Sequence, residues 1–230
     1  MLITIIMPCL NEAKAISKTI DEIPFNDLKE MGYEAELLVI DGGSSDGSVD
    51  IARSRGARVL ISERGYGRQY KLGFKYARGE IIVTADSDGS YPLSDIPRIL
   101  GLLNTNTFAF VSVNRFANMS PGAMNITRRA GNFILTQVTN LLFGLHIKDS
   151  QSGMWVFRKG ALRKLTLTSS GMSLSEEIII EAFKKLKAVE FPGLYKPRIG
   201  DSKLKPLRHG WQNLSFLVKK WKRDRSSKLR

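Results

Sequence analysis

The stretch Ile81-Ile82-Val83-Thr84-Ala85-Asp86-Ser87-Asp88 gives the strongest indication of the fold. Its first five residues are mostly apolar and β-branched, which is typical of a strand buried on both faces of a parallel sheet. Open α/β sheets bind their ligands at the carboxyl ends of such strands. Asp86 and Asp88 follow the strand directly, and carboxylate oxygens suit Mg²⁺ or Mn²⁺ better than zinc. We therefore expect Asp86 and Asp88 to hold such a cation together with the phosphates of a substrate.

Strand and helix patterns alternate on both sides of this stretch. Strands are predicted over residues 2–7, 36–40, 57–61, 108–113, 154–157 and 188–191. Helices are predicted over residues 12–23, 49–55, 69–77, 126–145, 174–186 and 211–222. This alternation predicts an α/β fold with a mainly parallel, Rossmann-like sheet flanked by helices.

The charge is concentrated at the carboxyl end of the 230-residue chain. Residues 203–230 hold ten Lys or Arg and one acid, Asp224, within a formal net charge of +13. Between Trp211 and Trp221 apolar residues repeat at helical spacing beside basic ones, as in helices that lie on a membrane surface. We divide the chain into an α/β domain over 1–205 and a basic amphipathic helical segment over 206–230. Packing of this apolar face on the core is the other interpretation.

Three features of the sequence bear on the cellular location of the protein. Residues 1–6 carry no basic group and predict a first strand rather than a signal peptide. No apolar stretch reaches the roughly 20 residues of a membrane span. The single cysteine, Cys9, fits a reducing compartment. We expect a cytoplasmic protein that associates peripherally with the cytoplasmic face of a membrane.

The turn Asp41-Gly42-Gly43-Ser44-Ser45-Asp46-Gly47-Ser48 follows the second predicted strand. Gly, Ser and Asp are ordinary turn residues, and Ser44 or Ser45 is suited to capping the next helix. The same turn is also suited to binding a nucleotide through its backbone amides and Asp41 at the edge of the sheet. Both interpretations stay open at this point.

Segments that follow the predicted strands resemble glycosyltransferase family 2. They are Pro8-Cys9-Leu10-Asn11-Glu12, the turn over 41–48, and Asp86-Ser87-Asp88-Gly89-Ser90-Tyr91-Pro92. Later segments narrow the resemblance to dolichyl-phosphate mannose synthases and related polyprenyl-phosphate sugar transferases: Asn114-Arg115-Phe116, Arg128-Arg129-Ala130-Gly131-Asn132, Asp149-Ser150-Gln151-Ser152-Gly153, and residues 198–204. The resemblance covers about residues 1–205. It implies a GT-A fold and an inverting transfer of a sugar, mannose first and glucose second, from GDP-mannose or UDP-glucose to a dolichyl or polyprenyl phosphate.

The resemblance also implies roles for individual residues. The nucleotide-sugar set is Pro8, Leu10, Glu12, Ile40, Asp41, Gly42, Asp86, Ser87, Asp88, Arg115, Arg198 and Lys203. The Mg²⁺ or Mn²⁺ ligands are Asp86, Asp88 and Ser90. The catalytic set is Asp88, Arg115, Arg128, Arg129, Asp149 and Glu176. The sequence departs from the family pattern at Gly42, where a second Asp is usual, and at Leu10, where Tyr is common.

The chemistry of the acceptor separates two hypotheses. A hydroxyl acceptor needs a general base, and Asp149 and Glu176 are the candidates. A lipid phosphate is largely anionic at neutral pH, because its second pKa is about 6, and it needs cations such as Arg128 and Arg129 instead. Each of these residues also has a structural interpretation: an exposed helix face for the arginines, a turn cap for Asp149, and a helix-dipole contact for Glu176.

Two other classes fit the sequence less well. A nucleotidyltransferase would need a Gly-rich, Lys-bearing segment near the amino terminus, which this sequence lacks. A nucleic-acid-binding protein would use the basic segment but would leave Asp86 and Asp88 unexplained, so we expect no nucleic-acid partner. Some relatives use an attached or separate membrane subunit, and such a partner stays open.

Overall fold

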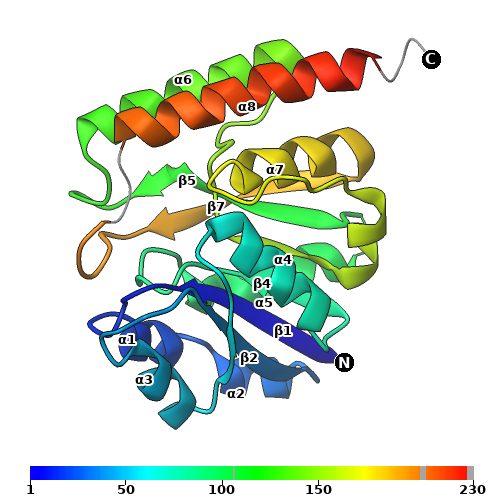
Figure 1. Ribbon diagram of the computed structural model, residues 1–230. Helices are drawn as coiled ribbons and strands as arrows, with labels where there is room; N and C mark the ends of the chain where they lie inside the picture. Colours follow the sequence, from blue (N-terminus) through cyan, green and yellow to red (C-terminus); the bar gives the residue numbers. More distant parts are fainter. Residues whose placement is uncertain (106, 203–205, 227–230) are drawn as a thin grey trace.

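The computed structural model describes residues 1–105, 107–202 and 206–226. Its centre is a seven-stranded sheet with the strand order β3-β2-β1-β4-β6-β5-β7 (Figure 1). The strands are β1 (Leu2–Cys9), β2 (Glu34–Asp41), β3 (Arg58–Ile61), β4 (Ile81–Thr84), β5 (Phe110–Met119), β6 (Trp155–Arg158) and β7 (Ala188–Tyr195). Only β6 runs antiparallel to its neighbours among these strands. The predicted α/β fold with a mainly parallel sheet is confirmed.

Helices cover both faces of the sheet, because successive side chains of each strand point to opposite faces. One face packs on α1 (Ile16–Asp21), α2 (Phe25–Glu30), α3 (Ser48–Ser54) and α5 (Ile96–Asn104), which follows the short helix η1 (Leu93–Asp95). The other face packs on α4 (Tyr66–Tyr76), η2 (Lys159–Lys164) and α7 (Leu174–Lys185). Thus Ile3 and Ile5 belong to the first core and Ile6 belongs to the second.

A third layer lies over α7. The helices α6 (Ile126–Phe143) and α8 (Pro206–Ser226) run side by side above it (Figure 1). Leu135 of α6, Ile180 of α7 and Leu217 of α8 form a small buried cluster, and Lys220 Nζ of α8 lies 2.5 Å from Glu181 Oε1 of α7. Within the described part of the chain, no helix has both the length and the apolar character needed to cross a bilayer.

Some predicted boundaries differ from the structure. The helix predicted from residue 12 begins only at Ile16, because the amides of Glu12 and Ala13 bind Ser48 Oγ and Asp46 Oδ2 instead, at 2.8 and 2.9 Å. The strand predicted to end at Val113 continues to Met119, where it pairs with β7 beyond an irregularity between Asn114 and Asn118. The helix predicted from Trp211 already begins at Pro206.

Candidate active site

The two carboxylates that follow β4 lie in a tightly bonded turn. Ser90 donates from both its amide (3.0 Å) and its hydroxyl (2.6 Å) to Asp88 Oδ1. Ser87 Oγ donates to the carbonyl of Pro8 at 2.8 Å, which ties this turn to the end of β1. Tyr66 OH donates to Asp86 Oδ1 at 2.9 Å. The sheet therefore brings Asp86, Ser87, Asp88 and Ser90 together at the carboxyl ends of β1 and β4. For Asp86 and Asp88 this is the position that the preceding strand pattern predicted.

The electrostatics of this turn suit a cation. Burial and the charge of Asp88 raise the pKa of Asp86 to about 7, although Tyr66, Arg115 and Arg198 act in the opposite direction. A divalent cation would favour the charged form of Asp86. The described residues contain no group of three or more His, Cys, Asp or Glu placed to hold a metal ion. Binding of a cation by Asp86, Asp88 and Ser90 stays a prediction.

An arginine links the two carboxylate-bearing segments. Arg198 Nη2 donates to Glu12 Oε1 at 2.9 Å, and its Nη1 lies 3.3 Å from Asp88 Oδ2. Glu12 stands in the segment that follows β1, next to half-buried Leu10, so the two predicted donor-side segments share one guanidinium. Lys203, predicted to lie near the phosphates, falls outside the described residues.

The side chain of Asp41 is hydrogen-bonded within its own turn. Its Oδ2 accepts from the amides of Gly43 and Ser44, both at 2.8 Å, and Ser44 Oγ donates to its Oδ1. Gln69 Nε2 links the ends of β1 and β2 by donating to the carbonyls of Cys9 (2.9 Å) and Ile40 (2.8 Å). The turn-forming interpretation of Asp41 is thus observed, and binding of a nucleotide by Ile40, Asp41 and Gly42 stays a prediction.

The arginine of the Asn114-Arg115-Phe116 segment forms a buried clamp with Asp149. Arg115 Nε and Nη2 donate to the two carboxylate oxygens of Asp149 at 2.7 and 2.8 Å. Burial disfavours the charged guanidinium, but Asp149 together with Tyr91 and Tyr195 raises the pKa of Arg115 above its ordinary value. The guanidinium also lies 5.5 Å from the ring centroid of Tyr195. Asp149 therefore orients an arginine, and it also caps its own turn by accepting from the amide of Gln151 at 3.0 Å.

Glu176 lies in the first turn of α7 and is fully buried. Its Oε1 accepts from Gln151 Nε2, whereas its Oε2 has no hydrogen-bond partner among the described residues. Burial raises the pKa of Glu176 to about 8, and the bond from Gln151 lowers it only in part. The carboxyl consequently keeps its proton at neutral pH.

The arginine pair of α6 lies beside an apolar groove. Arg128 donates to Ser202 Oγ, and exposed Arg129 lines a cavity of about 490 Å³. The lining of this cavity is Phe116, Ile126, Arg129, Ala130, Phe133, Gln137, Ile147 and Lys148. Phe116 follows Arg115 and Lys148 precedes Asp149 in the chain, so two of the lining residues are direct sequence neighbours of the clamp residues. No bond joins Arg128 or Arg129 to the carboxylate turn among the described residues.

Sequence reasoning missed several residues that shape the site. Besides Tyr66 and Gln69, Tyr91 OH accepts from the amide of Gly153 at 2.6 Å. A Cβ at Gly153 would collide with the Tyr66 hydroxyl and come within 3.3 Å of Asp86 Oδ1, so only glycine fits there. Tyrosine and glutamine on a helix carry no local signal of this kind, because the partners lie on distant segments.

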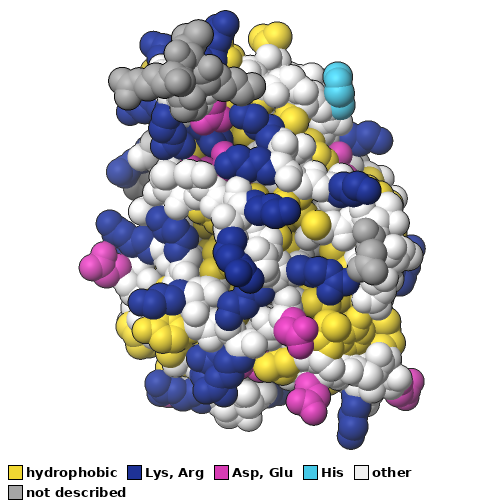
Figure 2. Space-filling view, turned by 90° about the vertical axis from the view of Figure 1, so that its right-hand side faces the viewer, with side chains coloured by type: hydrophobic (Ala, Val, Ile, Leu, Met, Phe, Trp, Pro, Cys, Tyr) yellow, Lys and Arg dark blue, Asp and Glu magenta, His cyan; other side chains and the backbone are white. Residues whose placement is uncertain are grey.

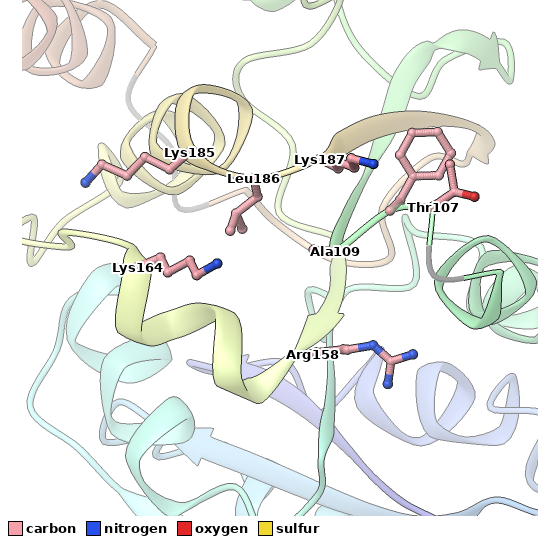
Figure 3. A pocket seen from close by; sticks show the side chains of 8 residues that line it. Thr107, Ala109, Arg158, Lys164, Lys185, Leu186 and Lys187 are labelled. Carbon is pink, nitrogen blue, oxygen red and sulfur yellow. The ribbon is translucent and has the colours of Figure 1, made fainter.

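A second hollow lies at the opposite end of the sheet, at the amino ends of β5 and β7. This cavity of about 330 Å³ is lined by Thr107, Phe108, Ala109, Arg158, Lys164, Lys185, Leu186 and Lys187 (Figure 3). Lys and Arg side chains are spread over this side of the molecule (Figure 2). Lys184 and Lys185 lie in the last turn of α7 and Lys187 follows the helix, where cations stabilise a helix dipole, so their charge has a structural reason.

Comparison with known proteins agrees with this geometry. Residues 4–166 match the model of glycosyl transferase family 2. The chain is 31% identical over 220 residues to the low-salt glycan biosynthesis hexosyltransferase Agl6 of Haloferax volcanii, covering 94% of this chain but 53% of that protein. It is 30% identical over 211 residues to the dolichyl-phosphate hexose transferase of the same organism, covering 90% of this chain and 89% of that protein. This chain thus spans only about half the length of Agl6.

A solved structure shows the same fold. Glucosyl-3-phosphoglycerate synthase from Mycobacterium tuberculosis superposes with a TM-score of 0.73 at 22% identity, covering 94% of this chain and 79% of that one. That likeness confirms the GT-A fold predicted from the sequence. With the matching family model and the carboxylate turn at the ends of β1 and β4, it follows that the chain belongs to glycosyl transferase family 2.

Proposed function

We propose that this protein transfers a hexose from a nucleoside-diphosphate sugar to the phosphate of a dolichyl or other polyprenyl lipid, with inversion. The observation that carries the proposal is the apolar groove beside the buried Arg115–Asp149 clamp. An acceptor that fits it has an apolar chain and an anionic head: Phe116, Ile126 and Phe133 suit the chain, and Arg129 and Lys148 suit the phosphate. The dolichyl-phosphate hexose transferase of Haloferax volcanii carries such an acceptor in its name.

The donor would bind at the carboxylate turn. Asp86, Asp88 and Ser90 would hold Mg²⁺ or Mn²⁺, which would neutralise the departing diphosphate. Arg198, fixed between Glu12 and Asp88, would add a positive charge beside the same phosphates. The mycobacterial synthase was crystallised with Mn²⁺ and UDP-glucose, which supports the metal and one candidate donor. GDP-mannose is the donor we favour, and UDP-glucose is the second.

The state of both candidate bases supports a phosphate acceptor. Asp149 is committed to Arg115 through both oxygens, and Glu176 holds its proton up to about pH 8. Asp149 is thus engaged by an arginine and Glu176 is fully buried, so neither presents an accessible carboxylate to an acceptor hydroxyl. A lipid phosphate needs no base, because it is already largely anionic.

We also propose that the protein lies peripherally on the cytoplasmic face of a membrane. Large apolar side chains are exposed on α6 and α8, among them Phe133 (59%), Leu141 (83%) and Trp211 (72%). Both helices belong to the layer that flanks the groove, and α8 adds basic residues such as Arg223 and Arg225. Apolar side chains with nearby cations are the combination that binds anionic lipid surfaces. The division into a catalytic domain over 1–205 and a surface-binding segment over 206–230 remains part of this proposal.

The direct test is a transfer assay with radiolabelled GDP-mannose and, in parallel, UDP-glucose. Dolichyl phosphate is supplied in detergent with Mg²⁺ or Mn²⁺, and label is measured in the lipid phase. We expect label from one donor in the lipid phase, and none when the metal is chelated. Binding of a nucleotide sugar without any lipid label would overturn the lipid-phosphate acceptor while leaving the donor site intact.

The double variant Arg128→Ala/Arg129→Ala is expected to lower kcat/KM for the lipid phosphate at least about tenfold, because charge-assisted bonds to phosphate are lost. KM for the nucleotide sugar should change by less than about twofold, since these residues lie away from the carboxylate turn. Steady-state kinetics with each substrate varied in turn measures both values. Arg163→Ala/Lys164→Ala, at the opposite end of the sheet, is the matched control. Full activity of the α6 variant would contradict the proposed acceptor site.

Glu176→Gln is expected to lower activity at pH 7 less than about tenfold, because glutamine resembles the protonated carboxyl. Loss of a general base would instead cost about 10²- to 10⁴-fold.

The stability of the same variant gives a second readout. The folded state raises the pKa of Glu176 from 4.5 to about 8, so it binds the proton more tightly than the unfolded chain does. The free energy of unfolding should therefore fall as pH rises from about 4.5 to about 8, and Glu176→Gln should remove that contribution. Urea unfolding across this pH range measures it, and an unchanged pH dependence in the variant would contradict the assignment.

A further inference from the structure

A chain of side-chain hydrogen bonds runs from α8 into the acceptor-side turn. Asn213 of α8 is 6% exposed, and its Nδ2 donates to Gln151 Oε1 at 2.9 Å. Ser173, which precedes α7, donates from its hydroxyl to Asn213 Oδ1 at 3.2 Å. Both polar atoms of the Asn213 amide are therefore used, and one of them reaches a residue of the turn over 149–153.

The Gln151 amide bonds to three partners through its two polar atoms. Its Nε2 donates to Ser150 Oγ at 3.0 Å and to Glu176 Oε1. Its Oε1 faces α8 and accepts from Asn213. Asn213 Nδ2 is the donor that satisfies this half-buried oxygen, and without it the acceptor would lose its bond.

The same turn carries the clamp. Asp149 accepts from the amide of Gln151 at 3.0 Å and holds Arg115 through both carboxylate oxygens. From α6, Thr136 Oγ1 lies 3.0 Å from Ser150 Oγ. The position of the Arg115 guanidinium thus depends on a turn that side chains of α6, α7 and α8 hold together.

We propose that Asn213 is a positioning residue, through which α8 fixes the turn over 149–153 and the Arg115–Asp149 clamp in the geometry that receives the acceptor phosphate. That the clamp receives an acceptor phosphate rests on the proposed function, whereas the coupling of α8 to the turn does not. Because α8 also exposes Trp211, binding of this helix to a lipid surface affects the position of the turn over 149–153. The helix is therefore part of the acceptor site and more than an anchor.

The variants that test this proposal are expected to fold. Leu217 still packs with Leu135 and Ile180, and Lys220 still pairs with Glu181. Asn213→Leu keeps the branched shape and the number of heavy atoms of the side chain while it removes both bonds, and Asn213→Ala removes those atoms as well. Gln212→Ala, at the exposed neighbouring position on α8, is the matched control.

The first readout is hydrogen–deuterium exchange of the full chain, measured by mass spectrometry without substrates. We expect peptides that contain residues 149–153 to exchange at least about fivefold faster in both Asn213 variants than in Gln212→Ala. Peptides from β1 and β4 should be unchanged. Equal exchange of the turn in all variants would overturn the coupling, and this result does not depend on which acceptor the enzyme uses.

The second readout is kinetic. Both Asn213 variants should lower kcat/KM for dolichyl phosphate about tenfold while KM for the donor changes less than about twofold. A general loss of structure would impair the kinetics with both substrates, the donor as well as dolichyl phosphate. Combining Asn213→Ala with Gln151→Ala should cost no more than Gln151→Ala alone, because Asn213 acts through Gln151. Additive losses, or acceptor kinetics equal to those of Gln212→Ala, would overturn the positioning role. Failure of the unaltered protein to label dolichyl phosphate would instead overturn the proposed function.

Discussion

Asp88→Asn is expected to lower the rate of sugar transfer by at least about a thousandfold. The substitution removes one of two carboxylates proposed to hold the cation, together with the partner of Arg198 at 3.3 Å. Loss of one preorganised electrostatic contact to a developing charge costs about 10²- to 10³-fold in rate, and a weakened cation adds to that. Transfer from GDP-mannose and UDP-glucose to dolichyl phosphate, at saturating donor and metal, measures the effect.

The design of this variant separates chemistry from folding. Asparagine keeps an Oδ1 that accepts from Ser90, so the turn should stay folded. Asp50→Asn, at a side chain that is 87% exposed on α3, is the matched control and should leave both stability and rate unchanged. Asp88→Asn should also weaken metal-dependent binding of the nucleotide sugar, measured by calorimetry. Near-normal transfer by this variant would remove the carboxylate turn from the mechanism.

Arg115→Gln is expected to have the second large effect, on stability as well as on activity. It leaves the buried carboxylate of Asp149 without its cation, and breaking a buried ion pair from one side costs about 3–5 kcal/mol. It also removes the buried cation nearest to the proposed acceptor groove, so transfer should fall at least about a hundredfold. Urea unfolding and steady-state transfer kinetics measure the two effects.

A second variant separates these two effects. Arg115→Gln/Asp149→Asn removes both charges of the clamp, so no uncompensated buried charge remains and most of the lost stability should return. Activity should not return, because the cation is still absent. Recovery of transfer in the double variant would mean that Arg115 serves folding alone, and the acceptor site would then have to be sought elsewhere.

The sequence predicted the position of the two carboxylates after β4 but not their bonding partners. Residues 81–88 alone predicted a buried strand with two carboxylates at its ligand edge, because a short β-branched run and a strand end are local patterns. The bonds of Asp86 and Asp88 could not be predicted in the same way. Tyr66, Arg198 and Gly153 come from three distant segments, and only the folded sheet brings them to one edge.

For the two helices of the outer layer, α6 and α8, the sequence likewise predicted the element but not its packing. Helical periodicity predicted both, and for the first it gave one apolar face over positions 126, 130, 133, 134, 138, 141, 142 and 145 without saying what covers it. In the structure this face is divided: Ile126, Phe133 and Leu141 are exposed. Val138, Leu142 and Leu145 instead pack against the buried cluster of Leu135, Ile180 and Leu217. Periodicity reports spacing along one helix, and the neighbour of each face is decided by tertiary packing.

The sequence by itself determined the α/β class, the carboxylate edge and the resemblance to family 2, because local spacing and strand-end motifs carry that information. Only the tertiary structure decided which groups are paired, protonated or open to a ligand. Asp149 became the partner of Arg115, Glu176 became a buried acid with a pKa of about 8, and Asn213 reached Gln151. These properties depend on burial and on partners far away in the chain, and both arise only when the segments pack together.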